Sequence, residues 1–296
     1  MKMVSQNTII DYRKRIITLK NKGIDFKKDV LGQLNKFYSN ENTKRTYMCA
    51  VLKMYEMNEI DIPENQVIQI KKEIMEIQQR YENNQKSQEM TSYQKENWPE
   101  DSLIEKVFND YNLDYSKMKI DRDSHRKLQR HLLTLLYMKN IPPLRSDYTR
   151  TVIGNENENY YNVKTKQFII TKFKKSEKKD PIIINVDDNI HEKILLMLQF
   201  RFTLGVTTMK RNSGNYGFIN MPLLLNYNLT ESLTPITLNQ EFKQMFKKNI
   251  STTMLRRWFL SKKFPVRENE SFDKREQVAK SMGNSTNVQH IYIKKK

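Results

Sequence analysis

The sequence predicts a mainly α-helical protein with a small antiparallel β-sheet, and three observations support this fold class. Apolar residues recur at helical spacing through most of the chain. Short runs rich in Tyr, Val, Phe, Ile and Thr interrupt that pattern, two within 159–173 and a third at 180–186. A polar segment divides the 296 residues, a length typical of about two domains.

The first 82 residues predict a small helical domain. Helices are expected within 7–58, and the run 43–57 has apolar residues at the i, i+3, i+4 and i+7 positions Met48, Val51, Leu52 and Tyr55. A further helix is expected over about 64–82, where apolar residues are spaced by three and four.

Residues 83–97 are rich in Asn, Gln, Lys, Glu and Ser, which is typical of a linker. The second domain is expected to cover 98–296, beginning with a helical stretch at 102–140 whose part 128–138 is apolar enough to be buried. The three predicted strands follow. Helical patterns then return at 190–202, 239–249, 251–263 and 273–282.

The composition excludes several classes of protein. Cys49 is the one cysteine, so neither a disulfide framework nor a cysteine-based zinc site is expected. No apolar stretch approaches the ~18 residues that span a bilayer, and the first residues lack the apolar core of a secretory signal. The net charge of +18 favours a polyanionic partner, most often nucleic acid. The alternative is a lysine-rich solvated surface in a protein from an AT-rich genome.

Three regions carry residues suited to phosphate chemistry. Arg145 follows a buried helix and two prolines, and a lysine-dense hairpin is predicted over 171–180. The C-terminal region supplies Arg256 and, near its end, Tyr292. Each has a simpler interpretation alone: a cation at a helix C-terminus, a solvated hairpin, or an incidental tyrosine.

Taken together, these motifs resemble the tyrosine recombinase (phage integrase) family, and most of all the integrase-like proteins of large DNA viruses and virophages. YMKNIPPLRSDY (137–148) is similar to the family's leucine-rich helix, prolines and first catalytic arginine. LRRWFLS (255–261) is similar to the box of the second arginine, and SMGNS (281–285) with Tyr292 to the family's ending. NTKRTYMCAVLKM (42–54) looks like a helix of the N-terminal, DNA-clamping core-binding domain, and YQKENW (93–98) like the start of the catalytic domain.

The resemblance implies DNA cleavage and rejoining through a 3′-phosphotyrosine, without metal or other cofactor. It assigns Tyr292 as the nucleophile and Arg145 and Arg256 as the guanidinium clamps on the phosphate oxygens. Guanidinium forks suit this role because they bind such oxygens bidentately. Lys174 aligns best with the lysine that protonates the leaving 5′ oxygen, and Lys172 is the second choice.

The chain departs from the family at two positions. Thr253 stands where the family usually has a histidine, and it cannot act as a general base at neutral pH. Asn284 stands where the family has a second histidine or a tryptophan, and its amide can still donate a hydrogen bond to a phosphate oxygen.

Double-stranded DNA is the expected partner, clamped between the two domains and contacted mostly at its phosphates. The family resemblance further implies a homotetramer on two synapsed DNA sites, and an intracellular, virus-encoded protein that acts in the cytoplasm or nucleus or is packaged in the virion. The candidate phosphate contacts are basic residues from both domains: Lys44, Arg45, Lys53, Lys172, Lys175, Lys210, Arg211, Lys247 and Lys248.

Two alternatives remain open. A type IB topoisomerase-like enzyme would share the clamp and the phosphotyrosine but only relax DNA. A non-catalytic DNA-binding protein on a degenerate recombinase scaffold would account for Thr253 and Asn284.

Overall fold

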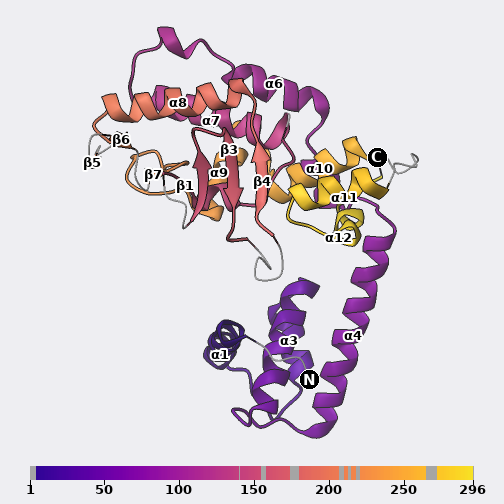
Figure 1. Ribbon diagram of the computed structural model, residues 1–296. Helices are drawn as coiled ribbons and strands as arrows, with labels where there is room; N and C mark the ends of the chain where they lie inside the picture. Colours follow the sequence, from indigo (N-terminus) through magenta and orange to yellow (C-terminus); the bar gives the residue numbers. More distant parts are fainter. Residues whose placement is uncertain are drawn as a thin grey trace. The chain divides into compact units, whose positions relative to one another are not determined.

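The computed structural model describes residues 5–139, 141–154, 158–173, 180–206, 210–212, 215–217, 221–264 and 272–295 (Figure 1). Its side chains are described except at 210–212, 215–217, 272, 287 and 290. The chain divides into two compact units, Met1–Ser87 and Gln88–Lys296, which are called unit 1 and unit 2 below.

Unit 1 consists of the helices α1 (Gln6–Asn21), α2 (Val30–Phe37), α3 (Glu41–Glu56) and α4 (Glu64–Lys86). Polar side chains cap the first three helices, because each accepts a hydrogen bond from a backbone amide of the first turn. The buried stripes of α3 and α4 include Met48, Val51 and Ile70, which meet in one apolar core. The helical periodicity of the sequence is therefore confirmed for this unit.

The polar segment 83–97 contains more regular structure than its composition indicates. Helix α4 continues to Lys86, and α5 (Ser92–Asn97) begins with a reciprocal cap between Thr91 and Gln94. Gln94 and Asn97 are buried in unit 2. Asn97 holds its place by accepting from the backbone amide of Asn249 at 3.0 Å.

Unit 2 is mainly helical, as the sequence predicts. Its helices are α6 (Asp101–Tyr111), α7 (Arg122–Met138), α8 (Asp188–Thr203), α9 (Pro235–Phe246), α10 (Thr252–Lys263), α11 (Phe272–Ser281) and α12 (Thr286–Tyr292). The predicted stretch 102–140 is interrupted, since a 3₁₀ turn (Tyr115–Lys117) separates α6 from α7. Helix α7 is buried along most of its last three turns, which explains why that part of the sequence is so apolar.

A small five-stranded sheet lies beside these helices, in the order β4-β3-β2-β1-β7 (Figure 1). Its strands are β1 (Thr151–Ile153), β2 (Asn159–Asn162), β3 (Gln167–Ile170), β4 (Ile182–Asn185) and β7 (Met221–Pro222). The three predicted strands are β2, β3 and β4, and they pair antiparallel as expected. The sheet as a whole is mixed, because β1 pairs parallel with β2. A separate hairpin of β5 (Lys210–Asn212) and β6 (Asn215–Gly217) was not predicted.

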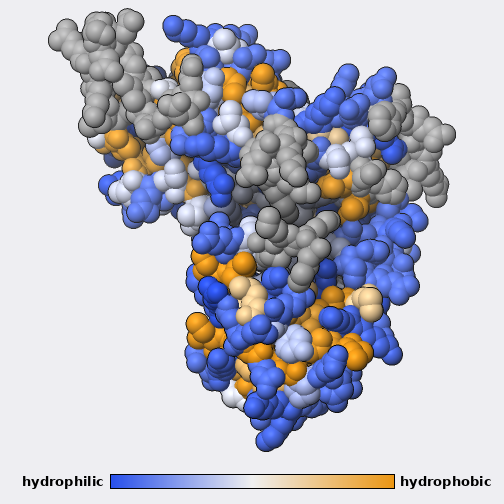
Figure 2. Space-filling view, turned by 60° about the horizontal axis from the view of Figure 1, so that its bottom comes forward, coloured by the Kyte–Doolittle hydropathy of each residue, from blue (hydrophilic) through white to orange (hydrophobic). Residues whose placement is uncertain are grey.

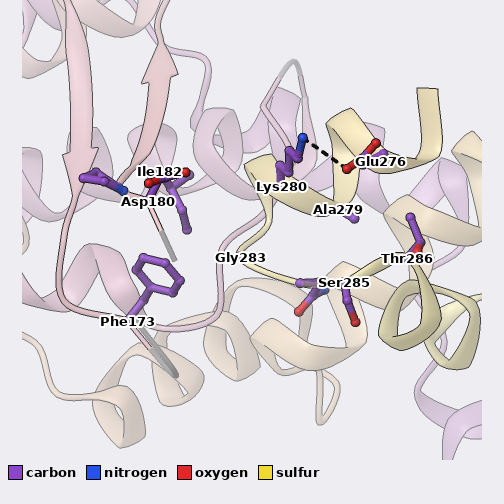
Figure 3. Close-up of a pocket in the computed structure, with 11 residues that line it drawn as sticks. Phe173, Asp180, Ile182, Glu276, Ala279, Lys280, Gly283, Ser285 and Thr286 are labelled. Carbon is purple, nitrogen blue, oxygen red and sulfur yellow. Dashed lines mark ion pairs between the residues drawn. The ribbon is translucent and has the colours of Figure 1, made fainter. Parts of the chain in front are cut away.

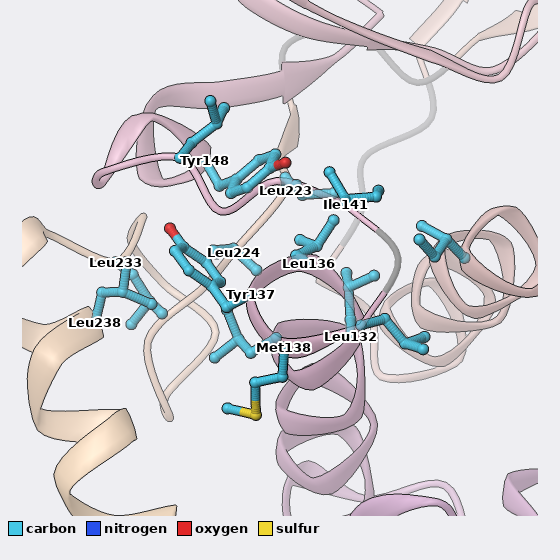
Figure 4. Packing of buried hydrophobic residues seen from close by; sticks show 14 of the residues in the cluster. Leu132, Leu136, Tyr137, Met138, Ile141, Tyr148, Leu223, Leu224, Leu233 and Leu238 are labelled. Atoms are coloured by element: carbon cyan, nitrogen blue, oxygen red, sulfur yellow. The ribbon is translucent and has the colours of Figure 1, made fainter. Parts of the chain in front are cut away.

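The core of unit 2 fixes the segment that carries Arg145. Tyr137 and Tyr148 are fully buried and pack edge to face, with ring centroids 5.6 Å apart (Figure 4). The Tyr137 hydroxyl donates to the backbone carbonyl of Arg145 at 2.8 Å. A buried tyrosine needs such a partner for its hydroxyl, so core packing and the position of Arg145 are coupled.

The C-terminal helices pack beside the β4 edge of the sheet, where α11 contacts β4 and α12 contacts both α10 and α11 (Figure 1). Lys294 and Lys295, which follow α12 and Ile293, form hydrogen bonds to earlier parts of unit 2. The Lys294 amide donates to Ser261 Oγ at 2.8 Å, and the Lys295 amide donates to the Gln88 carbonyl at 2.9 Å. Lys294 Nζ also donates to the Glu89 carbonyl at 3.2 Å.

The surface is mostly hydrophilic, with separate apolar areas between the polar ones (Figure 2). In unit 1 the exposed apolar side chains include Ile17, Ile68 and Met75. Among the described residues, none of the helices has the length and apolar character needed to cross a membrane.

Inside the core, Arg201 links α8 to the last residue of β7 and to the residue that follows it. Its guanidinium is fully buried and donates to the Pro222 and Leu223 carbonyls, both at 2.7 Å, and to His125 Nε2 at 3.0 Å. Burial lowers the pKa of Arg201 to about 9, so the group stays charged at neutral pH. Burial and the Arg201 charge lower the pKa of His125 to about 3, which keeps its Nε2 available as an acceptor.

Replacing this buried cation should destabilise unit 2. In Arg201→Met the two carbonyls and His125 lose their donor, and a buried unsatisfied acceptor costs about 1–3 kcal/mol. We expect a loss of about 2 kcal/mol or more in the free energy of unfolding, measured by urea denaturation. Lys117→Met, which removes an exposed pair with Asp114, is the control and should change little. Equal unfolding midpoints for the two variants would contradict the prediction.

Candidate active site

Arg256 is a buried cation held by two distant backbone carbonyls. It lies on α10, which Ser251 caps by accepting from the Met254 amide. Its Nη1 donates to the Pro143 carbonyl at 2.6 Å and its Nη2 to the Met282 carbonyl at 3.2 Å. Among the described residues its Nε has no hydrogen-bond partner. The next residue, Arg257, faces another direction on the helix and is half-buried.

The turn after α11 presents Asn284 to Arg145. The Gly283 amide bonds to the Lys280 carbonyl and the Asn284 amide to the Ala279 carbonyl, which together form a Schellman C-cap. Gly283 has φ +64°, and an added Cβ would lie 2.9 Å from Ile182 Cδ1, so the position requires glycine. From this turn, Asn284 Oδ1 accepts from Arg145 Nη2 at 3.2 Å.

A hollow of about 440 Å³ lies beside this turn (Figure 3). Phe173 and Ile182 face it from the sheet side, and Gly283, Asn284 and Ser285 line it from the C-terminal side. The hollow thus adjoins the Arg145–Asn284 contact. Its lining includes Phe173, from the start of the predicted lysine hairpin, and Asn284, from the turn that contacts Arg145.

Tyr292 ends α12 with its ring against Arg256. The guanidinium carbon lies 5.4 Å from the ring centroid, in a cation–π contact. The ring is half-buried and packs against the small apolar cluster of Leu260, Phe264, Val278, Met282 and Ile293. The structure therefore brings Tyr292, Arg256, Arg145 and Asn284 to one place.

The electrostatics of this group favour a negative charge. Burial raises the pKa of Tyr292, but the charges and hydrogen bonds of Arg256 and Arg145 outweigh it and lower the pKa below its usual value. Burial lowers the pKa of Arg256 to about 10, with the Arg145 charge adding to the effect, so that Arg256 remains protonated at neutral pH. Two cations thus face one phenol.

Asp147 is a residue of this site that the sequence analysis did not identify. Burial raises the pKa of its carboxyl, and the charges of Arg256 and Arg145 act against that increase. Asp147 is therefore the acidic neighbour of both arginines. Its one signal in the sequence is a carboxylate two positions after Arg145.

The other predicted catalytic residues are Thr253 and the lysines of the predicted hairpin. Thr253 is exposed on α10, and none of the described contacts that join Arg145, Arg256 and Tyr292 involves it. Lys174 lies outside the described residues, as does Lys175. Lys172 is exposed and forms an ion pair with Glu158 at 2.7 Å.

The predicted DNA contacts are distributed over both units. In unit 1, Lys44 Nζ already contacts Asn35 at 2.8 Å and Glu73 at 3.4 Å, and Lys53 pairs with Glu56 at 3.1 Å. Arg45 is half-buried, and among the described residues its Nε lacks a partner.

In unit 2, Lys247 and Lys248 are exposed after α9, and Lys248 Nζ donates to the Glu96 carbonyl at 3.4 Å. Lys210 and Arg211 lie in β5, with side chains outside the description. In the described part of the chain, no three His, Cys, Asp or Glu residues gather as a metal site would require.

Comparison with known proteins identifies no family. No protein-family model matches the chain, and no curated protein matches it. Among solved structures, the chain is similar to the crystal structure of XerA recombinase, with a TM-score of 0.44 and 11% identity over 99% of this chain and 89% of that one. A likeness this weak establishes neither the family nor the activity.

The ionisation of Tyr292 tests this electrostatic picture. We expect its phenol to ionise below the pKa of ~10 of a free tyrosine, observed as a phenolate difference spectrum between the wild type and Tyr292→Phe. In Arg145→Met the pKa should rise, because one of the two cations is lost while burial remains. A wild-type pKa at or above that of free tyrosine would contradict the prediction.

The same shift has a defined effect on stability. The folded state has the lower pKa, so ionisation of Tyr292 stabilises it above that pKa, and the contribution is lost as the pH falls through it. Tyr292→Phe should lack this stabilisation on the alkaline side and match the wild type in its pH dependence below it.

Proposed function

We propose that this chain is a tyrosine recombinase, which cuts and rejoins DNA through a 3′-phosphotyrosine on Tyr292. The observation that carries the proposal is the meeting of the Tyr292 phenol with Arg256 and Arg145, three side chains from separate parts of the sequence. A phenol facing two guanidinium groups is suited to attack a phosphodiester, because the same cations can bind the phosphate oxygens.

In the cleavage step, Tyr292 Oη forms a bond to phosphorus and the bond from phosphorus to the 5′ oxygen breaks. The electron pair of that bond passes to the 5′ oxygen, which takes a proton and leaves as a hydroxyl. The phenol loses its proton to solvent water before or during the attack. The two nearby cations favour that loss, since they stabilise the phenolate.

The arginines would supply the charge stabilisation that the transition state needs. Arg256 is fixed by the Pro143 and Met282 carbonyls, which are neutral acceptors, and with Arg145 it outweighs the one acidic neighbour Asp147, so positive charge stays available to an anion. Arg145 is half-buried beside Asn284, at the edge of the hollow. Preorganised donors of this kind contribute about 2.7–4 kcal/mol each.

The proton for the leaving oxygen is assigned to a lysine of the 172–179 segment, with Lys174 as the first choice and Lys172 as the second. Asn284 would hold Arg145 and contact the phosphate. Thr253 is exposed on α10, and the proposed step assigns it no proton transfer because a threonine hydroxyl cannot act as a general base at neutral pH. The proposal extends, on the sequence resemblance alone, to a tetramer on two synapsed sites and to a virus-encoded integrase.

A covalent adduct on a nicked suicide DNA tests the proposal. The wild type should form an adduct that Tyr292→Phe cannot form, because the nucleophilic oxygen is gone. Tyr227→Phe, which alters an exposed tyrosine bonded to Asp123, is the matched control and should react normally. Absence of an adduct across many DNA sequences would support the DNA-binding protein on the same scaffold.

Loss of one arginine should slow the step without abolishing DNA binding. Arg145→Ala should lower the single-turnover cleavage rate by about 10²–10³-fold, the usual effect of removing one such donor. A thermal melt separates this loss from unfolding. Relaxation of plasmids without site-specific joining would instead favour the topoisomerase-like alternative.

DNA affinity should depend steeply on salt, because a chain of net charge +18 releases counterions from the phosphates. With 6–10 phosphate contacts, affinity falls about 10³–10⁵-fold between 50 and 200 mM salt. Lys247→Ala should reduce the slope of log affinity against log salt concentration by about one. Lys44→Ala should reduce it less, because Glu73 already neutralises that ammonium. A flat salt response would contradict the prediction.

A further inference from the structure

Asn159 uses its whole side-chain amide to hold the backbone where the lysine-rich segment begins. It is fully buried at the start of β2. Its Oδ1 accepts from the Thr171 amide at 3.0 Å and from the Lys172 amide at 2.7 Å, and its Nδ2 donates to the Lys172 carbonyl at 3.0 Å. Both backbone groups of Lys172 are thereby fixed by one buried side chain.

These bonds begin where the strand ladder stops. The pairing of β2 with β3 ends at Tyr160 and Ile169, and β3 itself ends at Ile170. Thr171 and Lys172 would otherwise have free backbone groups in a partly buried place, where such groups favour a partner. The Asn159 amide therefore extends the order of the sheet by two residues, to the first lysine of the segment 172–179.

The next residue connects this anchor to the candidate active site. Phe173 is buried, and its Cδ2 lies 3.4 Å from the position that a Cβ on Gly283 would occupy (Figure 3). Gly283 precedes Asn284, which contacts Arg145. Residues 171–173 thus have Asn159 on one side and the turn that contacts Arg145 on the other.

The side chain of Lys172 adds little to this order. Its ion pair with Glu158 joins two side chains that are 55% and 43% exposed, and exposed pairs contribute little to stability. The Asn159 amide is the stronger constraint, because a fully buried side chain makes three bonds to this partly buried stretch of backbone.

We propose that Asn159 is a positioning residue for protonation of the leaving 5′ oxygen. This inference rests on the proposed function. A general acid must lie within hydrogen-bond reach of the atom that it protonates, and a lysine side chain has many rotamers, so the root of its segment needs a fixed position. When the bond from phosphorus to the 5′ oxygen breaks, the ammonium of the acting lysine in the 172–179 segment gives that oxygen a proton and becomes a neutral amine. Asn159 itself does not touch the DNA.

The test compares two nicked suicide DNAs that differ in one atom. In one the scissile phosphate carries the ordinary 5′ oxygen, and in the other a 5′ sulfur, whose thiolate can leave without a proton because a thiol has a pKa of ~8.5. Asn159→Ala should lower the single-turnover cleavage of the oxygen substrate by at least about tenfold, part of the ~10²–10⁴-fold that a positioned acid contributes. Cleavage of the sulfur substrate should stay within about threefold of the wild type.

Gln129→Ala is the matched control. The Gln129 amide clamps the backbone of Leu225 in the same way, donating to its carbonyl and accepting from its amide, both at 2.8 Å. Its loss should affect both substrates equally. The ratio of the two rates is measured on the same folded fraction, so partial unfolding does not change it. If Asn159→Ala does not fold, Asn159→Asp keeps the shape and the acceptor but loses the donor, and its ratio should shift in the same direction.

The outcomes separate the inference from the proposed function. An equal loss on both substrates in the Asn159 variants, or no loss on either, overturns the positioning role while the wild-type adduct still supports the recombinase. Absence of a wild-type adduct with both DNAs overturns the proposed function, and the positioning role with it.

Discussion

The buried charge of Arg256 is the constraint on which the rest of the site depends. Taking a guanidinium out of water costs several kcal/mol unless its N–H groups are satisfied. Here the partners are the Pro143 and Met282 carbonyls, 113 residues before and 26 residues after Arg256. These segments cannot separate from α10 without leaving the cation buried and unpaired. Both hydrogen-bond partners are neutral and Asp147 is an acidic neighbour, so the two arginines outweigh the one carboxylate and leave a net positive charge that an anionic group can neutralise.

The sequence could predict those parts of the molecule in which apolar residues recur at regular spacing or in which a motif stands. Helix α3 (Glu41–Glu56) lies close to the predicted 43–57, since its apolar stripe is regular. Strands β1 and β7 have three and two residues, too few for any alternation to be visible, so the mixed character of the sheet could not be foreseen. A motif likewise found Arg145, Arg256 and Tyr292, which the structure brings together.

The parts that could not be predicted depend on long-range contacts. The motif predicted that Thr253 lies on a helix but not where its side chain faces, and that side chain is exposed. Asp147 belongs to the site because the core holds its segment beside Arg256, and nothing local indicates this. Asn159 acts on backbone groups about a dozen residues later, and a bond between a side chain and a distant backbone leaves no periodic pattern.

The two bonds that follow Tyr292 have a mechanical consequence. Lys295 shares a backbone hydrogen bond with Gln88, and Lys294 bonds to Ser261 of α10. Gln88 comes one residue after the end of unit 1. Tension applied to the chain where it leaves α4 would therefore be transmitted, through the bonds of Gln88 and Glu89 to Lys295 and Lys294, to the residues that closely follow Tyr292. A pull on the first residues of unit 2 would thus reach the end of α12, where Tyr292 lies.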